Sequence, residues 1–170
     1  ESFSVAGSRL SYRHHALRAH PDIVDVAVLS PEPGVVNLYP LVKTGLPGSA
    51  VLNAVAAACS DEKVRPLTDT VEVLPPAEYA YAISARLVLY HTADAATVLA
   101  AAQDAAAGFA IQRQAALGRD VVPSQIIAAL SVPGVYQVEL LSPAGLMAVP
   151  DHGWAHCIDI DVELSGGANG

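Results

Sequence analysis

The feature that most constrains the fold is a regular alternation of apolar and polar residues near the end of the chain. Residues 157–164 read CIDIDVEL, with an apolar side chain at every second position. Successive side chains of a β-strand point to opposite faces, so this pattern predicts a strand with one buried and one solvated face. The apolar residues expected to point inward are Ile158, Ile160, Val162 and Leu164. The acidic residues expected to point outward are Asp159, Asp161 and Glu163.

Sheets with one solvated face are typical of antiparallel strand pairs. A parallel sheet of the Rossmann type is covered on both faces and gives continuous apolar runs, and no glycine-rich phosphate loop follows any expected strand here. The alternation therefore predicts an α+β protein with mostly antiparallel sheets and helices on one face.

Composition narrows the class of protein further. Hydrophobic residues make up 52% of the 170 residues, so the chain can bury a core and is expected to be globular. The net charge is −8, and the nine Lys and Arg residues do not cluster. Nucleic acids and anionic membrane surfaces are bound through gathered basic residues, so neither is an expected partner. The alanine-rich stretch at residues 93–116 carries charged residues and is not expected to span a membrane.

The first part of the chain is expected to form a module of alternating strands and helices. Ser8 is a candidate cap for a helix that ends near Pro21, and Ser49 is a candidate cap for a second helix. The expected strands are residues 3–7, 23–29, 35–43 and 71–73. Pro40 cannot donate a ladder hydrogen bond, which favours an edge strand or a bulge there. This order of elements is that of a ferredoxin-like sandwich.

The second part of the chain repeats an α+β pattern after the pair Pro75 and Pro76, which is the best candidate boundary. Residues 79–90 alternate as a long strand, with Arg86 on its outer face. Thr92 is expected to cap a long alanine-rich helix, and Gly118 is placed to end it in a left-handed conformation. A short helix then begins near Pro123, and residues 135–141 form a further strand.

We therefore expect two small ferredoxin-like sandwiches with mostly antiparallel sheets. The first module covers residues 1–75, the second covers residues 76–165, and residues 166–170 form a flexible tail. The two cysteines, Cys59 and Cys157, fall in different modules and are expected to be reduced thiols.

The heptapeptide DHGWAHC, residues 151–157, resembles a metal site in composition. His152 and His156 are four residues apart, and Cys157 follows. However, Gly153 lies between the histidines, a strand pattern follows them, and the glutamate of the zinc-protease motif is missing. We expect this segment to be a loop that holds no metal ion. No Ser, Cys or Lys has a neighbouring base at a recognised spacing, so no catalytic or cofactor-binding residue is predicted.

The segment EKVRPLTDTVEV, residues 62–73, is expected to form a rigid connection between a helix and a strand. Pro66 blocks continuation of the helix, and Asp69 lies within reach of Arg65 or of loop amides. An ordinary helix-to-strand connection would carry the same features.

Several segments together resemble the C-terminal part of baseplate J-like proteins, which belong to the contractile tails of phages and phage-derived particles. They are SVAG (4–7), SPEPGVV (30–36), VRPLTDTVEV (64–73), LGRDVVPSQIIAAL (117–130) and PGVYQVELLSP (133–143). The similarity covers nearly the whole chain. Family members carry an additional N-terminal region, and a first residue of Glu1 is consistent with a chain that lacks it.

The resemblance implies a structural, non-enzymatic baseplate wedge protein. Such proteins join neighbouring wedges around a sixfold hub and help to transmit the trigger for sheath contraction. The implied partners are wedge and hub proteins and further copies of the chain, without nucleic acid, membrane or small-molecule substrate. The implied locations are the host cytoplasm during assembly and then the tail baseplate. The motif residues are expected to be architectural: Arg65, Pro66, Leu67, Thr68, Asp69, Gly118, Arg119 and Asp120.

Two alternatives remain open from the residues themselves. The first is a regulatory module that binds a small molecule, since paired ferredoxin-like modules can bind ligands at their interfaces, although the sequence reveals no pocket. The second is a metal-dependent enzyme that uses His152, His156 and Cys157.

Overall fold

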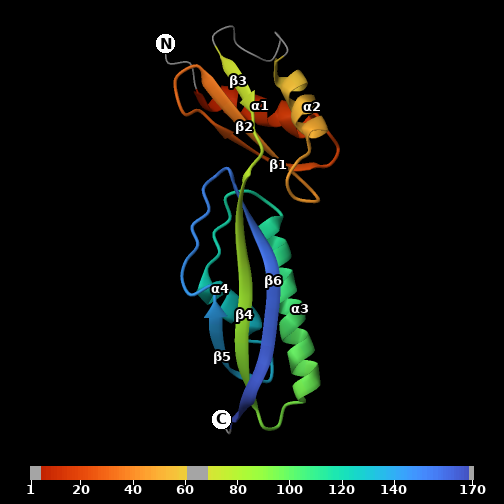
Figure 1. Cartoon of the computed structure of the whole chain (residues 1–170), viewed down its shortest axis with the longest axis vertical. Helices are drawn as coiled ribbons and strands as arrows, with labels where there is room; N and C mark the ends of the chain where they lie inside the picture. Colours follow the sequence, from red (N-terminus) through yellow and green to blue (C-terminus); the bar gives the residue numbers. More distant parts are fainter. Residues whose placement is uncertain (1–4, 61–68, 169–170) are drawn as a thin grey trace. The chain divides into compact units, whose positions relative to one another are not determined.

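The computed structural model describes residues 5–60 and 69–168, which form two compact units (Figure 1). The first unit comprises Glu1–Ala77, Ala115–Gly118 and Pro150–Trp154, and the second comprises Glu78–Gln114, Arg119–Val149 and Ala155–Gly170. The predicted domain limits at residues 75 and 76 stay a prediction. The α+β fold class is confirmed, since each unit combines a three-stranded sheet with helices.

The first unit contains two helices and three strands in the sheet order β1-β2-β3. Its elements are α1 (Val5–Arg18), β1 (Ile23–Leu29), β2 (Val35–Val42), α2 (Ser49–Ser60) and β3 (Thr70–Val73). Strand β2 runs antiparallel to β1 and parallel to β3. The parallel pair arises because α2 lies between β2 and β3 in the chain, and parallel neighbours need such a crossover.

The core of the first unit lies between its sheet and its helices. Tyr12 of α1, Leu38 of β2 and Val55 of α2 are each at most 1% exposed and belong to one apolar cluster. Val36 and Val42 join the same cluster, so alternate residues of β2 face the helices.

The strand predicted at residues 3–7 is wrong for the residues that the structure describes. Residues 5–7 belong to α1, while residues 3 and 4 lie outside the described residues. Ser8 is therefore inside the helix and does not cap it. Extending an existing helix adds one hydrogen bond for each residue fixed, whereas a lone five-residue strand needs a neighbour, so helix propagation wins here.

Pro40 lies in β2, the central strand, so the first predicted alternative, an edge strand, is wrong. The second alternative, a bulge, agrees with a register shift in the facing strand β1, between Ile23 and Asp25. Strand β3 pairs only with Val35–Leu38 of β2, and Pro40 lies beyond that pairing, opposite Val26 of β1. Because β2 has one neighbour at this point, the missing amide hydrogen breaks no ladder bond.

The second unit holds the sheet β5-β4-β6 and two helices. Its elements are β4 (Ala77–Tyr90), α3 (Ala95–Gln114), α4 (Pro123–Leu130), β5 (Val135–Ser142) and β6 (Gly153–Ala168). The first residues of β4 and β6, namely Ala77, Gly153 and Trp154, belong to the first unit. Ile83 and Leu87 of β4 pack with Ala102 of α3 and Ile126 of α4, and all four are fully buried. Both helices therefore cover the same face of the sheet.

Each sheet is mixed, which differs from the predicted mostly antiparallel arrangement. Strand β4 is antiparallel to β5. The amide of Ala77, at the start of β4, bonds to the carbonyl of His152, and the amide of His91 bonds to the carbonyl of Ala168 at the end of β6. Strands β4 and β6 thus run in the same direction (Figure 1). The long connection through α3, α4 and β5 permits this arrangement.

Asp94, and not Thr92, caps α3. The Asp94 carboxylate accepts hydrogen bonds from the amide and the hydroxyl of Thr97, and these bonds lower the pKa of Asp94. Asp94 directly precedes the first helical residue, which is where a capping oxygen reaches the free amides of the first turn. Gly118 has the predicted left-handed conformation, with φ at +66°, four residues beyond the end of α3.

The alternation that predicted β6 holds only in part. Val162 is buried and Ile160 packs against the core, but Ile158 is 63% exposed and Leu164 is 39% exposed. Cys157 contacts the core in place of Ile158. The strict alternation is therefore interrupted between Cys157 and Ile160. Within residues 5–60 and 69–168, no helix is long and apolar enough to cross a membrane.

Candidate functional site

The segment DHGWAHC, expected to be a loop, forms a turn at Asp151 and His152 and then enters β6 at Gly153. Its candidate metal ligands make separate contacts. The His152 ring lies 5.0 Å from the Tyr39 ring, while the Nδ1 of His156 lies 2.5 Å from the carboxylate of Glu78. The thiol of Cys157 donates to the carbonyl of Asp159. In the part of the chain that the structure describes, no group of three or more His, Cys, Asp or Glu residues could hold a metal ion.

The two cysteines are free thiols. Burial raises the pKa of Cys59 to about 11, and burial also raises the pKa of Cys157. A thiol acts as a nucleophile in its thiolate form, and a raised pKa keeps it protonated near neutral pH. Both cysteines therefore have the character of structural residues.

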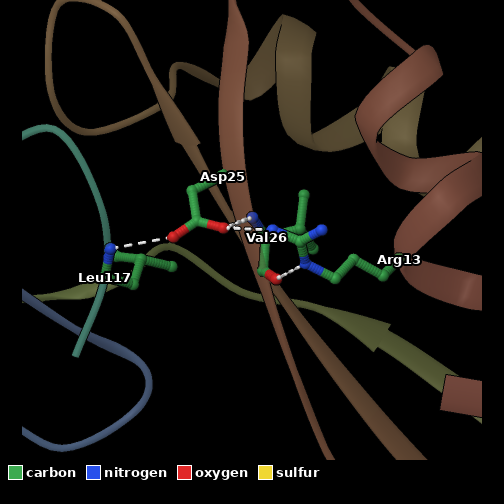
Figure 2. Close-up of polar contacts among 4 residues, drawn as sticks. All are labelled: Arg13, Asp25, Val26 and Leu117. Carbon is green, nitrogen blue, oxygen red and sulfur yellow. Dashed lines mark hydrogen bonds and ion pairs between the residues drawn. The ribbon is translucent and has the colours of Figure 1, made fainter. Parts of the chain in front are cut away.

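Asp25 is the centre of a polar cluster in the first unit (Figure 2). One carboxylate oxygen accepts from the Arg13 guanidinium at 2.8 Å and from the Val26 amide at 2.9 Å. The other oxygen accepts from the Leu117 amide at 3.0 Å. The Nε of Arg13 also donates to the Val26 carbonyl at 3.2 Å.

This cluster closes the outer edge of β1. The Leu38 carbonyl accepts a hydrogen bond from the Leu74 amide on the β3 side. Leu38 and its partner Val28 are therefore a pair without hydrogen bonds between β1 and β2. Val26 lies two residues before Val28, so its amide and carbonyl also point away from β2, to the free edge of the sheet. There the amide donates to the Asp25 carboxylate and the carbonyl accepts from Arg13. Side chains that form hydrogen bonds with the free backbone groups of an edge strand protect it from pairing with other strands. Sequence patterns do not reveal this cluster, because Arg13, Asp25 and Leu117 are far apart in the chain.

Replacing Asp25 by Ala is expected to speed hydrogen exchange of the Leu117 amide by about five- to thirtyfold, since one lost hydrogen bond to a charged acceptor corresponds to roughly 1–2 kcal/mol. Replacing Arg13 by Ala should leave that amide protected, because Arg13 is 47% exposed and binds the other carboxylate oxygen. Amide exchange followed by NMR measures both effects. Equal exchange of Leu117 in the Asp25→Ala variant and the parent would show that the carboxylate does not hold this segment.

The motif RPLTD is only partly visible. Arg65, Pro66, Leu67 and Thr68 lie outside the described residues. Asp69 is described, and its carboxylate accepts a hydrogen bond from the Tyr12 hydroxyl at 3.0 Å. Tyr12 is 1% exposed and belongs to the core of the first unit. Asp69 therefore gives a hydrogen-bond acceptor to a buried side chain of α1.

Replacing Asp69 by Ala is expected to lower the free energy of unfolding by about 1–3 kcal/mol, because the buried Tyr12 hydroxyl loses an acceptor. The same substitution in a Tyr12→Phe background should cost clearly less, since the donor is then already absent. Urea denaturation of the four proteins in this double-mutant cycle measures the coupling. A zero coupling energy would remove the architectural role proposed for Asp69.

The segment LGRD follows α3 and connects it to the rest of the second unit. The Arg119 guanidinium donates to the Gln112 carbonyl in the last turn of α3, at 2.7 Å. Asp120 accepts from the Val149 amide, also at 2.7 Å, and the neighbouring Val121 forms a two-bond bridge with Met147. A cation at a helix C-terminus satisfies carbonyls that lack partners within the helix. These contacts support the architectural role expected for Arg119 and Asp120, which stays a prediction.

The face of the second sheet opposite its helices is polar and exposed. Arg86 of β4 lies directly opposite Glu139 of β5, and the Tyr90 and Tyr136 rings meet edge to face at 5.4 Å. The acidic residues of β6 predicted to point outward are all exposed: Asp159, Asp161 and Glu163. Cross-strand pairs of this kind stabilise a solvated sheet face and leave it accessible to other molecules.

These features define a class of small mixed α+β modules with a solvated sheet face and a strand edge that side chains protect. The fold is similar to that of a chain in the cryo-EM structure of the anti-feeding prophage (AFP) baseplate, with a TM-score of 0.60 and 18% identity. The similarity covers 88% of this chain and 36% of that chain, and it shows the shared fold.

The sequence comparisons give the family. Residues 4–75 match the baseplate J-like central domain, and residues 81–163 match the baseplate J-like protein C-terminal domain. The chain belongs to the baseplate J-like family, which confirms the predicted resemblance. It is 34% identical over 168 residues to baseplate protein J of Escherichia phage P2. The aligned region covers 98% of this chain and 55% of that relative.

Proposed function

We propose that the chain is part of a structural subunit of a contractile-tail baseplate and that it has no catalytic activity. The observation that carries the proposal is the match of two baseplate J-like domains to residues 4–75 and 81–163, in order along one chain. The similarity to baseplate protein J of phage P2 and the fold shared with a chain of the AFP baseplate structure support it.

The geometry is suited to assembly. The second sheet leaves one face exposed for neighbouring subunits, while Asp25 and Arg13 protect the free edge of the first sheet from unspecific pairing. In this proposal the subunit assembles in the host cytoplasm and contacts wedge proteins, hub proteins and further copies of itself around a sixfold axis. It would join neighbouring wedges and pass on the trigger for contraction.

The separation of the histidines and the raised pKa of both thiols favour the structural proposal over a metal enzyme. No specific observation favours a regulatory module that binds a small molecule.

Deletion of the gene and complementation test the proposal. We expect host cells that lack the protein to produce no complete tails in negative-stain electron microscopy, and a plasmid copy should restore them. Antibody gold against the protein should label the baseplate end of the restored tails. Complete, contractile tails in the absence of the protein would contradict a structural role.

A further inference from the structure

A groove lies between α3 and α4 of the second unit, and nothing in the family match assigns a role to it. Its apolar lining consists of Phe109 and of four small residues: Ala105, Gly108, Ala128 and Ala129. A side-chain carbon placed on Gly108 would meet no atom within 4 Å, so the space above this residue is open. Small residues on facing helices let another main chain approach closely, as they do where helices pack on each other.

Arg113 supplies the charge of this groove. Its guanidinium carbon lies 5.1 Å from the centre of the Phe109 ring, in a cation–π arrangement. Its Nη1 reaches two neutral acceptors, the Asp120 carbonyl and the Gln125 side chain, each at 3.5 Å. Its Nε is buried and has no hydrogen-bond partner within the part of the chain that the structure describes. Arg113 is absent from the ion pairs formed among residues 5–60 and 69–168.

A partly buried guanidinium without a counterion is unfavourable, because the protein replaces its water shell only in part. The sequence carries an excess of acidic residues, with a net charge of −8, yet none of the described carboxylates pairs with Arg113. An incoming carboxylate can form the bidentate contact that a guanidinium prefers. Charge and shape therefore call for the same ligand, an apolar group with a carboxylate beside it.

We propose that this groove is a docking site for a segment of a neighbouring baseplate subunit that places an apolar side chain over Phe109 and a carboxylate on Arg113. The inference rests on the proposed baseplate function and specifies the chemistry of one partner. The carboxylate belongs to an Asp or Glu side chain or to a chain terminus of the partner. The apolar floor contributes burial, and the single charge fixes the orientation of the segment.

Site-specific photo-cross-linking in assembled particles tests the proposal. Gln112 lines the groove, and a benzoylphenylalanine at this position is expected to cross-link to another baseplate subunit when purified tails are irradiated. Mass spectrometry should map the adduct to a segment with an apolar residue next to Asp, Glu or a C-terminus. The matched control is Ile111, the preceding residue of α3, which is 65% exposed and outside the groove lining. It should give at least fivefold less of that adduct.

Two variants make the test specific. Gly108→Leu fills the open space and improves helix propensity, so it should fold normally by circular dichroism and reduce the adduct at least tenfold. Arg113→Glu should reduce the adduct to a similar extent, whereas Arg113→Lys, which keeps the charge, should retain part of it. Since Gly108→Leu preserves Arg113, the two variants examine the shape and the charge of the groove separately.

The results separate failure of this inference from failure of the proposed function. Particles that contain the protein but give no intersubunit adduct from position 112 would overturn the docking site alone. An adduct unaffected by Gly108→Leu, or one mapped to a basic segment, would overturn it as well. Complete tails from which the protein is missing would instead contradict the proposed function.

Discussion

Replacing Leu87 by Ala is expected to lower the free energy of unfolding by about 2–5 kcal/mol, because it leaves a cavity in a filled core. Leu87 is fully buried in the middle of β4, opposite Val138 of β5 and within the cluster that includes Ala102 and Ile126. Alanine side chains on the facing helix are too short to move into the space. Urea denaturation, followed by far-ultraviolet circular dichroism, measures the change.

Arg86 provides the matched control, since it is the preceding residue of the same strand and is exposed on the other face. Arg86→Ala truncates an exposed side chain whose cross-strand neighbour is Glu139, so its cost is expected to stay below about 1 kcal/mol. Similar losses for the two variants would mean that the helices do not cover the face of β4 on which Leu87 lies.

Replacing Gly45 by Ala is expected to lower the free energy of unfolding by about 2–5 kcal/mol, as the sum of two separate penalties. Gly45 has φ at +111°, a conformation that costs a residue with a side chain roughly 1–2 kcal/mol. The added carbon would also lie 2.7 Å from the Trp154 ring, an overlap that costs about 1–3 kcal/mol to relieve. Gly45 exchanges two hydrogen bonds with Val42, so the backbone cannot turn away easily.

A glycine-to-alanine control of opposite sign is available at Gly108. It lies inside α3, has no positive φ, and has open space where the methyl group would go. Gly108→Ala should therefore stabilise the protein by about 0.5–1 kcal/mol. Thermal melts of the two variants measure the difference. A neutral Gly45→Ala variant would show that the turn relaxes around the methyl group.

Elements with long regular patterns could be predicted from the sequence. The alternation in β4 and the three- and four-residue spacing in α3 each extend over many residues and agree with the observed burial. The strand expected at residues 3–7 rested on a short stretch, and helix propagation from α1 overrode it at residues 5–7. Ile158 shows the same limit, because a local irregularity in β6 exposes a residue that strict alternation would bury.

The polar sites differ in how far the sequence could reveal them. The segment LGRD stood out through the family resemblance. Its contact between Arg119 and Gln112 joins residues that are close in the chain. The Asp25 cluster could not be found in this way, since Leu117 is 92 residues away from Asp25 in the chain. Nor could spacing show that Arg113 has no carboxylate partner among the described residues, because that depends on where the carboxylates lie after folding.

The assembly role can be measured most directly by cryo-EM of intact tails that carry the protein. We expect the density of the baseplate to contain both units, with the β5-β4-β6 sheet and helices α3 and α4 recognisable next to density from neighbouring subunits. A baseplate reconstruction resolved well enough to trace main chains, in which neither unit can be placed, would contradict the proposed role.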